Sequence, residues 1–333
     1  MRSLALCSSL GCAAFLCIAG AAAQTPAAKP VGAFPAKPIR IVIPYPPGGT
    51  SDILARMIGI KITESWGQSV LVENRTGANG NIGAEFVARA PADGYTYLVT
   101  DIGNLSVASN VFKLSYDPHR DLAPVTTISY SPHMLTTHPS LPVKTTRELI
   151  ALVKANPGKL NLPTGLGGAT HFGAMEFAQR TGINWTYIPT RGGADSSRSV
   201  MGGETEILLL GMLQTLPHVK SGRLKLIAVS SEKRLPSLPD TPTISEGPGL
   251  AGFISGSWQG LLAPAKAPQE IIDRVNAEMA RILAMPDIKE KLQTQGTEPL
   301  PTKPQEMAKW MAVEKERNAK LIKSTGFNIN TLN

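Results

Sequence analysis

Residues 39–66 read IRIVIPYPPGGTSDILARMIGIKITESW, and this stretch decides the fold class. The β-branched run at 39–43 is typical of a buried strand, and the apolar residues three and four apart in 50–66 are typical of a helix with one face on a core. The Pro and Gly residues at 44–49 interrupt both patterns. The stretch therefore predicts a strand, a glycine loop and an amphipathic helix.

The same unit occurs a second time, with a strand at 159–163, a glycine loop at 164–168 and a helix at 169–180. Strands and helices alternate along most of the chain, which predicts an α/β protein with mainly parallel sheets. Further strands are expected at 70–73, 95–100, 186–188, 206–210, 224–229 and 257–263, and further helices at 82–90, 146–155, 268–284, 286–295 and 304–325.

The composition indicates a globular protein of two domains. The chain has 333 residues, of which 42% are hydrophobic and 17% are charged, and a domain holds about 150 residues. This composition excludes a charged, disordered polymer. No apolar run after residue 23 approaches the ~20 residues that span a membrane, so a membrane bundle is excluded as well.

The N-terminal residues have the layout of a secretory signal. A basic residue precedes an apolar stretch from Leu4 to Gly20, and small residues precede a cleavage site after Ala23. We therefore expect residues 1–23 to be removed on export, with 24–37 as a flexible lead-in. All three cysteines lie inside the signal, so the exported protein is expected to hold no disulfide, thiolate nucleophile or cysteine-ligated metal.

The net charge of +8 leaves two interpretations open. It serves solubility, or it creates a positive potential that draws anionic ligands into a cleft. The basic residues are scattered and are not interleaved with aromatic residues, so no nucleic-acid partner is expected.

The two glycine loops are candidate anion-binding sites. Glycine lets backbone N–H groups approach a ligand closely, and the first turn of the following helix offers unpaired donors at the positive end of its dipole. Two such loops in opposite halves of the chain predict a pair that faces across a cleft. Neither loop carries a nucleotide-binding motif, so no phosphate cofactor is expected.

Two titratable residues lie beside these loops. His171 follows the second loop, where its ring either points into the cleft and donates to an acid or caps its own loop. Asp52 follows the first loop, where an acid favourably caps the helix dipole, so we expect it to support that loop. No pair among the five histidines has the spacing of metal ligands, so no metal site is expected.

The sequence contains none of the catalytic motifs that we looked for. It contains no G-x-S-x-G serine, no Cys–His pair in the exported part and no paired acids on a plausible scaffold. We therefore expect a protein that is not an enzyme.

Several blocks of sequence resemble the Bug family of periplasmic receptors, the TctC-like solute-binding components of tripartite tricarboxylate transporters. The blocks are 44–52, 73–85, 90–96, 155–160, 216–218, 238–243 and 258–264. The resemblance implies a two-domain, type II-like periplasmic binding protein whose domains are mainly parallel sheets flanked by helices and joined by two crossover strands. Domain 1 is expected at 38–124 plus 256–333, and domain 2 at 125–255.

The resemblance also implies a small carboxylate held between the domains, which close on it. Carried over residue by residue, it places ligand contacts at Tyr45, Pro47, Gly48, Gly49, Thr50, Thr100, Asp101, Gly103, Asn104, Gly165, Gly167, Thr170 and His171. Asp101 is an unusual residue for a turn that faces a carboxylate. It either points away from the ligand or binds a ligand amine.

Two departures from the family pattern bear on specificity. Many members have Tyr-Lys-Gly where this chain has Thr190, Arg191 and Gly192, and an Asp where it has Leu210. A buried Asp would suit an amine or hydroxyl, because burying it unpaired is costly. Leu210 removes that option, so we expect the far end of the ligand to be apolar or aromatic. Arg191 would be the counter-charge if a second carboxylate is present.

The resemblance thus implies a monomeric receptor without cofactor that delivers its carboxylate to a membrane permease. A ligand sensor for a partner such as a sensor kinase has the same fold and stays an alternative. A periplasmic hydrolase is the alternative in another class, and it requires a nucleophile beside a base.

Overall fold

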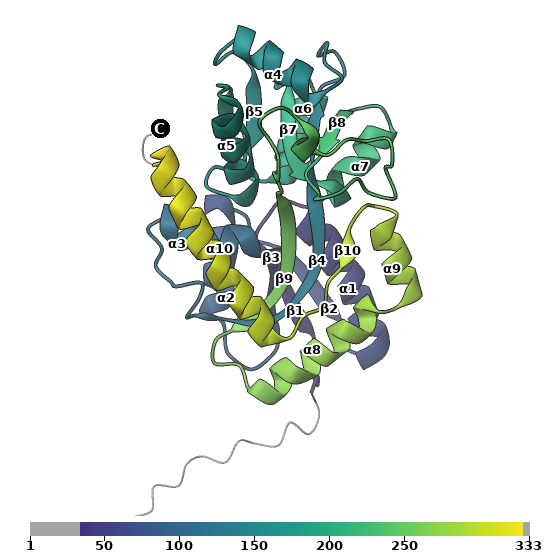
Figure 1. Cartoon of the computed structure of the whole chain (residues 1–333). Helices are drawn as coiled ribbons and strands as arrows, with labels where there is room; N and C mark the ends of the chain where they lie inside the picture. The colour runs from purple at the N-terminus through teal and green to yellow at the C-terminus, as the bar shows by residue number, and fades with distance from the viewer. Residues whose placement is uncertain (1–33, 329–333) are drawn as a thin grey trace, which may run out of the picture. The chain divides into compact units, whose positions relative to one another are not determined.

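The computed structural model describes residues 34–328 (Figure 1). The predicted signal peptide and its cleavage site lie outside the described residues. Strand β1 (Ile39–Ile43) and helix α1 (Thr50–Trp66) have the bounds that the sequence predicts. The helix ends at Gly67, which adopts the left-handed conformation with φ 66° and donates its N–H to the Thr63 carbonyl.

β1 lies inside the sheet of the first lobe. It pairs in parallel with β2 (Val70–Asn74) on one side and β3 (Thr96–Asp101) on the other. Antiparallel pairs then add β9 (Gly256–Pro264), β4 (Leu122–Thr137) and β10 (Glu298–Pro299). The order is β10-β4-β9-β3-β1-β2. The sheet is therefore mixed and not mainly parallel as predicted, because only the pairs of β1 with β2 and with β3 are parallel in it.

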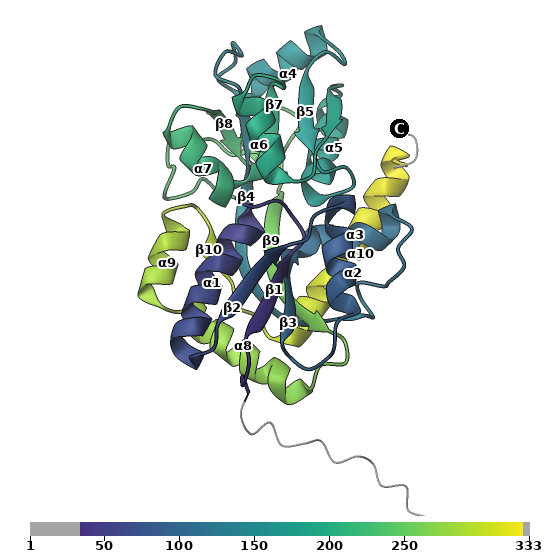
Figure 2. The same ribbon diagram turned by 180° about the vertical axis from the view of Figure 1, so that it is seen from behind.

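Helices cover this sheet. They are α2 (Asn81–Ala88), α3 (Ile102–Val111), α8 (Gln269–Leu283), α9 (Pro286–Gln293) and α10 (Pro304–Thr325). Figures 1 and 2 show α3 and α10 side by side on one side of the sheet, and α1 with α8 on the other. Fully buried Val42, Leu98, Leu262 and Met307 join strands and helices into one core.

The second lobe contains four strands and four helices of its own among the described residues. The strands are β5 (Asn161–Thr164), β6 (Thr186–Pro189), β7 (Ile207–Gly211) and β8 (Lys225–Val229), and the helices are α4 (Thr146–Ala155), α5 (Ala169–Thr181), α6 (Gly193–Met201) and α7 (Met212–Lys220). β5 and β6 pair in parallel, whereas β7 and β8 pair antiparallel with the end of β4. Phe177 stacks on Trp185 at 5.3 Å in the core of this lobe.

Two crossover strands join the lobes. β4 pairs with β9 as far as Pro132 and with β7 from His133 onward, and β9 begins beside this point at Gly256. The two-lobed α/β fold with two crossover strands is thus confirmed. The division into domains stays a prediction, and β4 changes its partner later than the predicted boundary at residue 124.

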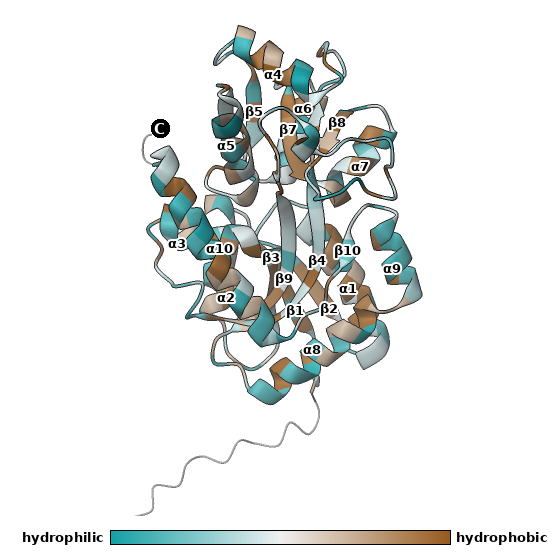
Figure 3. Cartoon of the chain, viewed as in Figure 1, coloured by the Kyte–Doolittle hydropathy of each residue, from teal (hydrophilic) through white to brown (hydrophobic). Residues whose placement is uncertain are grey.

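Hydropathy explains why β4 was not expected. Figure 3 shows β1 and β7 in apolar colour, whereas β4 is paler along its length. β4 is nevertheless mostly buried, because it lies inside the sheets, beside β9 and β10 in the first lobe and between β7 and β8 in the second. Among residues 34–328, no helix combines the length and the apolar character needed to cross a membrane.

Gly83 positions α2 against the base of the first glycine loop, and this contact can be tested. A Cβ at Gly83 would lie 2.9 Å from Pro44 Cα and 2.8 Å from the Arg75 carbonyl oxygen, both of them backbone atoms. We expect Gly83→Ala to lower the free energy of unfolding by about 1–3 kcal/mol, as overpacking does, although Ala is the better helix former. Urea denaturation would measure the change.

Gly59→Ala in α1 is the matched control. The three atoms nearest to its Cβ would all belong to side chains, the closest being Val70 Cγ1 at 3.1 Å, so we expect a smaller loss or a gain. Equal stability of wild type and Gly83→Ala would contradict the close packing of α2 on Pro44.

Candidate functional site

A cavity of about 70 Å³ lies where loops of the two lobes meet. The first lobe contributes the loops after β1 and β3 and part of β9, and the second lobe contributes the loops after β5, β6 and β7. The lining residues are Tyr45, Gly49, Thr50, Ser51, Asn79, Asp101, Asn104, His133, Gly165, Thr170, Gly192, Gly193, Ser196, Leu210, Gly211, Gln214, Ser257 and Gln259.

Four helices begin at this cavity. The N-caps of α1, α5, α6 and α7 are Gly49, Gly168, Gly192 and Gly211, and none of these helices has a side-chain cap. Three of the four N-cap glycines line the cavity, as does Thr170 in the first turn of α5. Glycine has no side-chain acceptor, so none of these helices caps its own first-turn N–H groups. Ala169 N of α5 is bonded to Asn104 Oδ1 and Leu213 N of α7 to Ser131 Oγ, and the other first-turn N–H groups are available to a ligand at the positive ends of the dipoles.

The two predicted glycine loops do meet at this cavity, and α6 and α7 add two helix starts that the sequence analysis missed. The signal for both was present, because β7 ends in Gly211 and a Gly pair at 192–193 lies shortly after β6. No Lys or Arg is among the lining residues. The cavity therefore offers partial positive charge from backbone groups, which is suited to an anion.

Asp52 supports the first glycine loop, as expected. Its carboxylate accepts a hydrogen bond from Gly48 N at 3.0 Å and pairs with Arg56 at 2.8 Å. Asn74 Nδ2 donates both to Asp52 and to the Tyr45 carbonyl, each at 3.0 Å. Gly48 has φ +86°, which favours glycine. The loop is thus held from outside the cavity, and the Gly48 N–H is occupied by Asp52.

Asn104 links the two lobes. Its Nδ2 donates to the Tyr45 hydroxyl at 2.9 Å, and its Oδ1 accepts from the Ala169 N–H in the first turn of α5 at 2.5 Å. Thr100 also contacts the Tyr45 hydroxyl, at 3.4 Å. Burial raises the pKa of the Tyr45 phenol well above its usual range, so it stays a neutral hydroxyl at the wall of the cavity.

Asp101 lines the cavity and caps α3. Its Oδ1 accepts from Gly103 N at 2.9 Å and Asn104 N at 3.2 Å, and its Oδ2 accepts from Ser257 Oγ at 2.6 Å. These bonds occupy both oxygens, so the structure gives Asp101 a capping role. Burial raises the pKa of this carboxyl to about 6, against the opposing effect of the hydrogen bonds.

His171 shows the second of its two expected roles. Its Nδ1 accepts the Gly167 N–H at 3.1 Å, which caps the loop before α5. The ring is buried and is not among the residues that line the cavity. Burial lowers the pKa of His171 to about 4, so the imidazole is neutral at neutral pH and Nδ1 can accept.

Eight of the predicted contact residues line the cavity and eight do not. Those that line it are Tyr45, Gly49, Thr50, Asp101, Asn104, Gly165, Thr170 and Leu210; those that do not are Pro47, Gly48, Thr100, Gly103, Gly167, His171, Thr190 and Arg191.

Arg191 and Thr190 lie on the loop before α6 but are engaged elsewhere. The Arg191 side chain is 76% exposed and pairs with Asp195 at 2.7 Å, so the structure does not bring it to the cavity. Thr190 Oγ1 is hydrogen-bonded to Ser196 Oγ at 2.8 Å. Arg191 as counter-charge for a second carboxylate stays a prediction without support from this geometry.

Three polar atoms of the cavity lack a partner among the described residues. Thr50 Oγ1, His133 Nε2 and Gln214 Oε1 are buried and make no hydrogen bond there. A buried polar atom without a partner costs about 1–3 kcal/mol, so such atoms cluster where a ligand or water completes the bonding. His133 and Gln214 were missed, because only the tertiary fold brings β4 and α7 to the glycine loops.

His133 is not placed as a catalytic base. Its Nδ1 lies 3.1 Å from Ser255 Oγ, but Ser255 does not line the cavity. Burial lowers the pKa of His133 to about 3, which makes it a weak base at neutral pH. Among residues 34–328, no group of three His, Cys, Asp or Glu side chains is placed to hold a metal ion.

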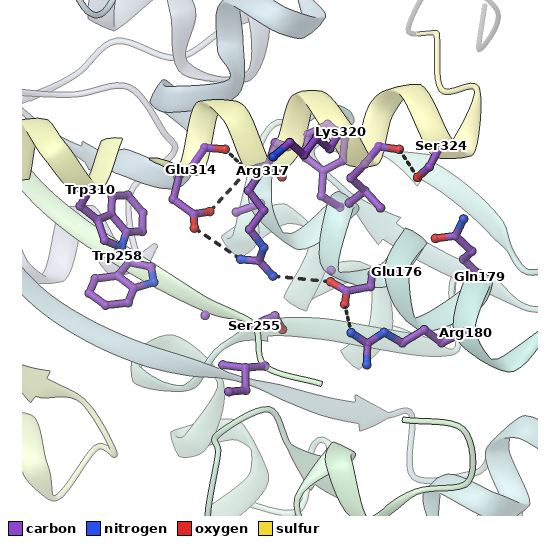
Figure 4. A pocket seen from close by; sticks show the side chains of 18 of the residues that line it. Glu176, Gln179, Arg180, Ser255, Trp258, Trp310, Glu314, Arg317, Lys320 and Ser324 are labelled. Carbon is purple, nitrogen blue, oxygen red and sulfur yellow. Dashed lines mark hydrogen bonds and ion pairs between the residues drawn. The ribbon is translucent and has the colours of Figure 1, made fainter. Parts of the chain in front are cut away.

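A larger groove of about 520 Å³ lies between α5 and α10 (Figure 4). Side chains alternate along β9, so Trp258 faces this groove while Ser257 and Gln259 face the cavity. Trp258 packs on Trp310 with ring centroids 4.8 Å apart. The described residues that line the groove leave no buried side-chain polar atom without a partner, so the smaller cavity is the candidate site.

Comparisons with known proteins agree with the resemblance seen in the sequence. Residues 54–327 match the family described as "Tripartite tricarboxylate transporter family receptor". The structure "R. palustris Rpa4515 with adipate" has 33% identity and a TM-score of 0.85, covering 88% of this chain and 98% of that one. The periplasmic binding protein BugD has 30% identity and a TM-score of 0.83, covering 89% and 99%. MatC from Rhodopseudomonas palustris with bound malate has 28% identity and a TM-score of 0.81, covering 87% and 100%.

The raised pKa of Asp101 has a consequence for stability. Its folded pKa of about 6 exceeds the ordinary 3.8, so between these values the folded protein holds a proton that the unfolded chain has released. Asp101 therefore lowers the free energy of unfolding as pH rises through this window. As the pH rises from 4 to 7, we expect the free energy of unfolding of Asp101→Asn to increase relative to that of wild type by on the order of 2–3 kcal/mol.

Urea denaturation at several pH values without ligand would measure this gain. Asp52→Asn is the control of opposite sign, because the pKa of Asp52 is lowered and its carboxylate stabilises the fold above that pKa. A difference between Asp101→Asn and wild type that does not change with pH would contradict the assignment.

Proposed function

The chain belongs to the receptor family of tripartite tricarboxylate transporters, and we propose that its cavity binds a small organic carboxylate for delivery to the membrane components of such a transporter. One observation carries this proposal. Four helices start at the cavity with a glycine N-cap and no side-chain cap of their own, and no cationic side chain lines it. Backbone N–H groups and dipoles are then the natural partners of carboxylate oxygens.

Binding and closure are coupled, because the donors come from both lobes. α1 belongs to the first lobe, and α5, α6 and α7 belong to the second. A carboxylate that touches only one lobe gains part of the available bonds, and it gains the rest when the lobes meet. The ligand therefore shifts the population toward the closed form by its differential affinity.

We propose a small carboxylate with an apolar part as the ligand, such as a dicarboxylate with a hydrocarbon middle. The solved relatives described above hold adipate and malate, both dicarboxylates. Leu210 is buried at the cavity wall, where it suits a hydrocarbon part of the ligand. Thr50 Oγ1, His133 Nε2 and Gln214 Oε1 remain as polar partners for the oxygens and hydroxyls of the ligand.

We further propose that residues 1–23 direct export to the periplasm and are cleaved after Ala23, and that the receptor works there as a monomer. The periplasmic binding protein BugD supports this location. A receptor that reports its closed form to a sensor kinase instead of a permease has the same site. Binding to the purified permease of a tripartite transporter, with and without ligand, separates these two roles.

A panel of mono- and dicarboxylates tests the proposed ligand class by thermal shift. A ligand at 100 times its dissociation constant adds about 2.7 kcal/mol. We expect stabilisation by aliphatic or aromatic dicarboxylates and none by amino acids. Stabilisation only by amino acids or polyhydroxy acids would refute the proposed role of Leu210.

Gly49 tests the placement of the site. Its φ of −79° is open to any residue, and a Cβ would meet only Gln214 Oε1 at 3.5 Å and Pro46 O at 3.6 Å. We expect Gly49→Ala to keep binding, whereas the longer side chain of Gly49→Leu fills the cavity and weakens binding by roughly 100-fold or more. Titration calorimetry would measure the affinity of each variant. The melting temperature without ligand would show whether each variant is folded. Wild-type affinity in Gly49→Leu would place the site elsewhere.

A further inference from the structure

Helix α10 is part of the first lobe but ends at the second. Met307 and Met311 on its first half are buried in the core of the first lobe. Its last turns lie beside α5, as Figure 1 shows for the C-terminal end of the helix. The residues that follow the helix thus leave one lobe and contact the other.

α10 and the residues that follow it contact α5 in two ways. Arg317 of α10 pairs with Glu176 of α5 at 3.6 Å, across the groove in Figure 4. The ring of Phe327 packs edge-on against His171 at 5.0 Å and against Phe172 at 5.7 Å. The ion pair is partly exposed and therefore adds little to the stability of the contact between the lobes. The aromatic contact buries apolar surface and is therefore the stronger of the two.

The Phe327 contact fixes the imidazole of His171. Besides Phe327, the ring meets Tyr187 at 4.5 Å and Phe172 at 6.0 Å. Aromatic rings therefore surround the imidazole, and its Nδ1 is turned toward the Gly167 N–H. Without Phe327 the ring loses one of these neighbours and with it part of its orientation.

The Gly167 bond holds a loop that has little room to move. Gly167 has φ +75°, and a Cβ there would lie 2.6 Å from Val111 of the first lobe. The same loop places Gly165 and Thr170 at the wall of the cavity. The orientation of His171 is thus coupled to the position of two lining residues.

We infer that Phe327 is a positioning residue for the ligand site, acting through His171 on the loop between β5 and α5. The contact joins a segment anchored in the first lobe to a helix of the second, so it forms when the lobes are together. It thereby keeps the loop ordered and slows ligand release more than it speeds ligand capture. This kinetic part rests on the proposed function, whereas the ordering of the loop does not.

Hydrogen exchange of the ligand-free full chain tests the ordering. We expect Phe327→Ala to raise the exchange of residues 165–171 by at least about tenfold, the loss of a local protection of about 1.4 kcal/mol. Phe327→Leu keeps an apolar side chain and should restore most of the protection. Phe86→Ala is the matched control, because Phe86 is also a partly buried Phe of the first lobe but packs on Arg75.

A double-mutant cycle tests the route. Asn at position 171 keeps an acceptor for Gly167 N but has no ring for Phe327. We therefore expect Phe327→Ala to add little further exchange in a His171→Asn background. Unchanged exchange in Phe327→Ala, an equal rise in Phe86→Ala, or additive effects in the cycle would each overturn the inference.

Stopped-flow binding of adipate supplies the functional arm. We expect Phe327→Ala to raise the dissociation rate about tenfold and to change the association rate less. If wild type binds neither adipate nor any other carboxylate of the panel, the proposed function fails while the exchange experiment still decides the role of Phe327. An unchanged dissociation rate beside faster exchange would overturn the kinetic part alone.

Discussion

The site depends on helix N-termini that have no side-chain cap. Most helices satisfy their first N–H groups with Ser, Thr, Asp or Asn, as α4 does here with Thr145. The helices α1, α5, α6 and α7 have glycine at the N-cap and cap none of these donors themselves. The donors that are not bonded from elsewhere, as Ala169 N is by Asn104, are open to one cavity. A glycine N-cap makes each of these helices less stable than a Ser, Asp or Asn N-cap would. Packing of the helices against the sheets compensates for this loss. The constraint explains why glycine follows one strand after another in this chain.

The loops that present these donors are held from behind, by residues outside the cavity. Asp52 holds the first loop through Gly48, and His171 holds the second through Gly167. Asn104 joins Tyr45 in one lobe to α5 in the other. This arrangement leaves the inner face of each loop to the ligand, and it preorganises the donors so that binding does not have to order them.

Local patterns predicted the parts of this fold that local patterns determine. α1, α4 and α10 have the predicted bounds, because apolar spacing and capping residues mark them clearly. α6 and α7 have nine residues each, α6 is rich in Ser and α7 contains Pro217, so in the sequence these short segments resemble loops. Half of the expected contact residues line the cavity. The His133 and Gln214 contributions could not be foreseen, because they depend on how β4 and α7 are placed by the tertiary fold.

The lack of lysine and arginine around the cavity also affects release. A receptor that held its anion with a buried guanidinium would leave that charge without a counter-ion when the anion departs, at a high desolvation cost. Here the donors are fractions of a charge on separate helices in separate lobes. When the lobes move apart, the attraction is divided among exposed helix ends that water solvates readily. Release of the anion therefore leaves no unpaired cationic side chain in the cavity, and the cost of such a charge does not oppose it.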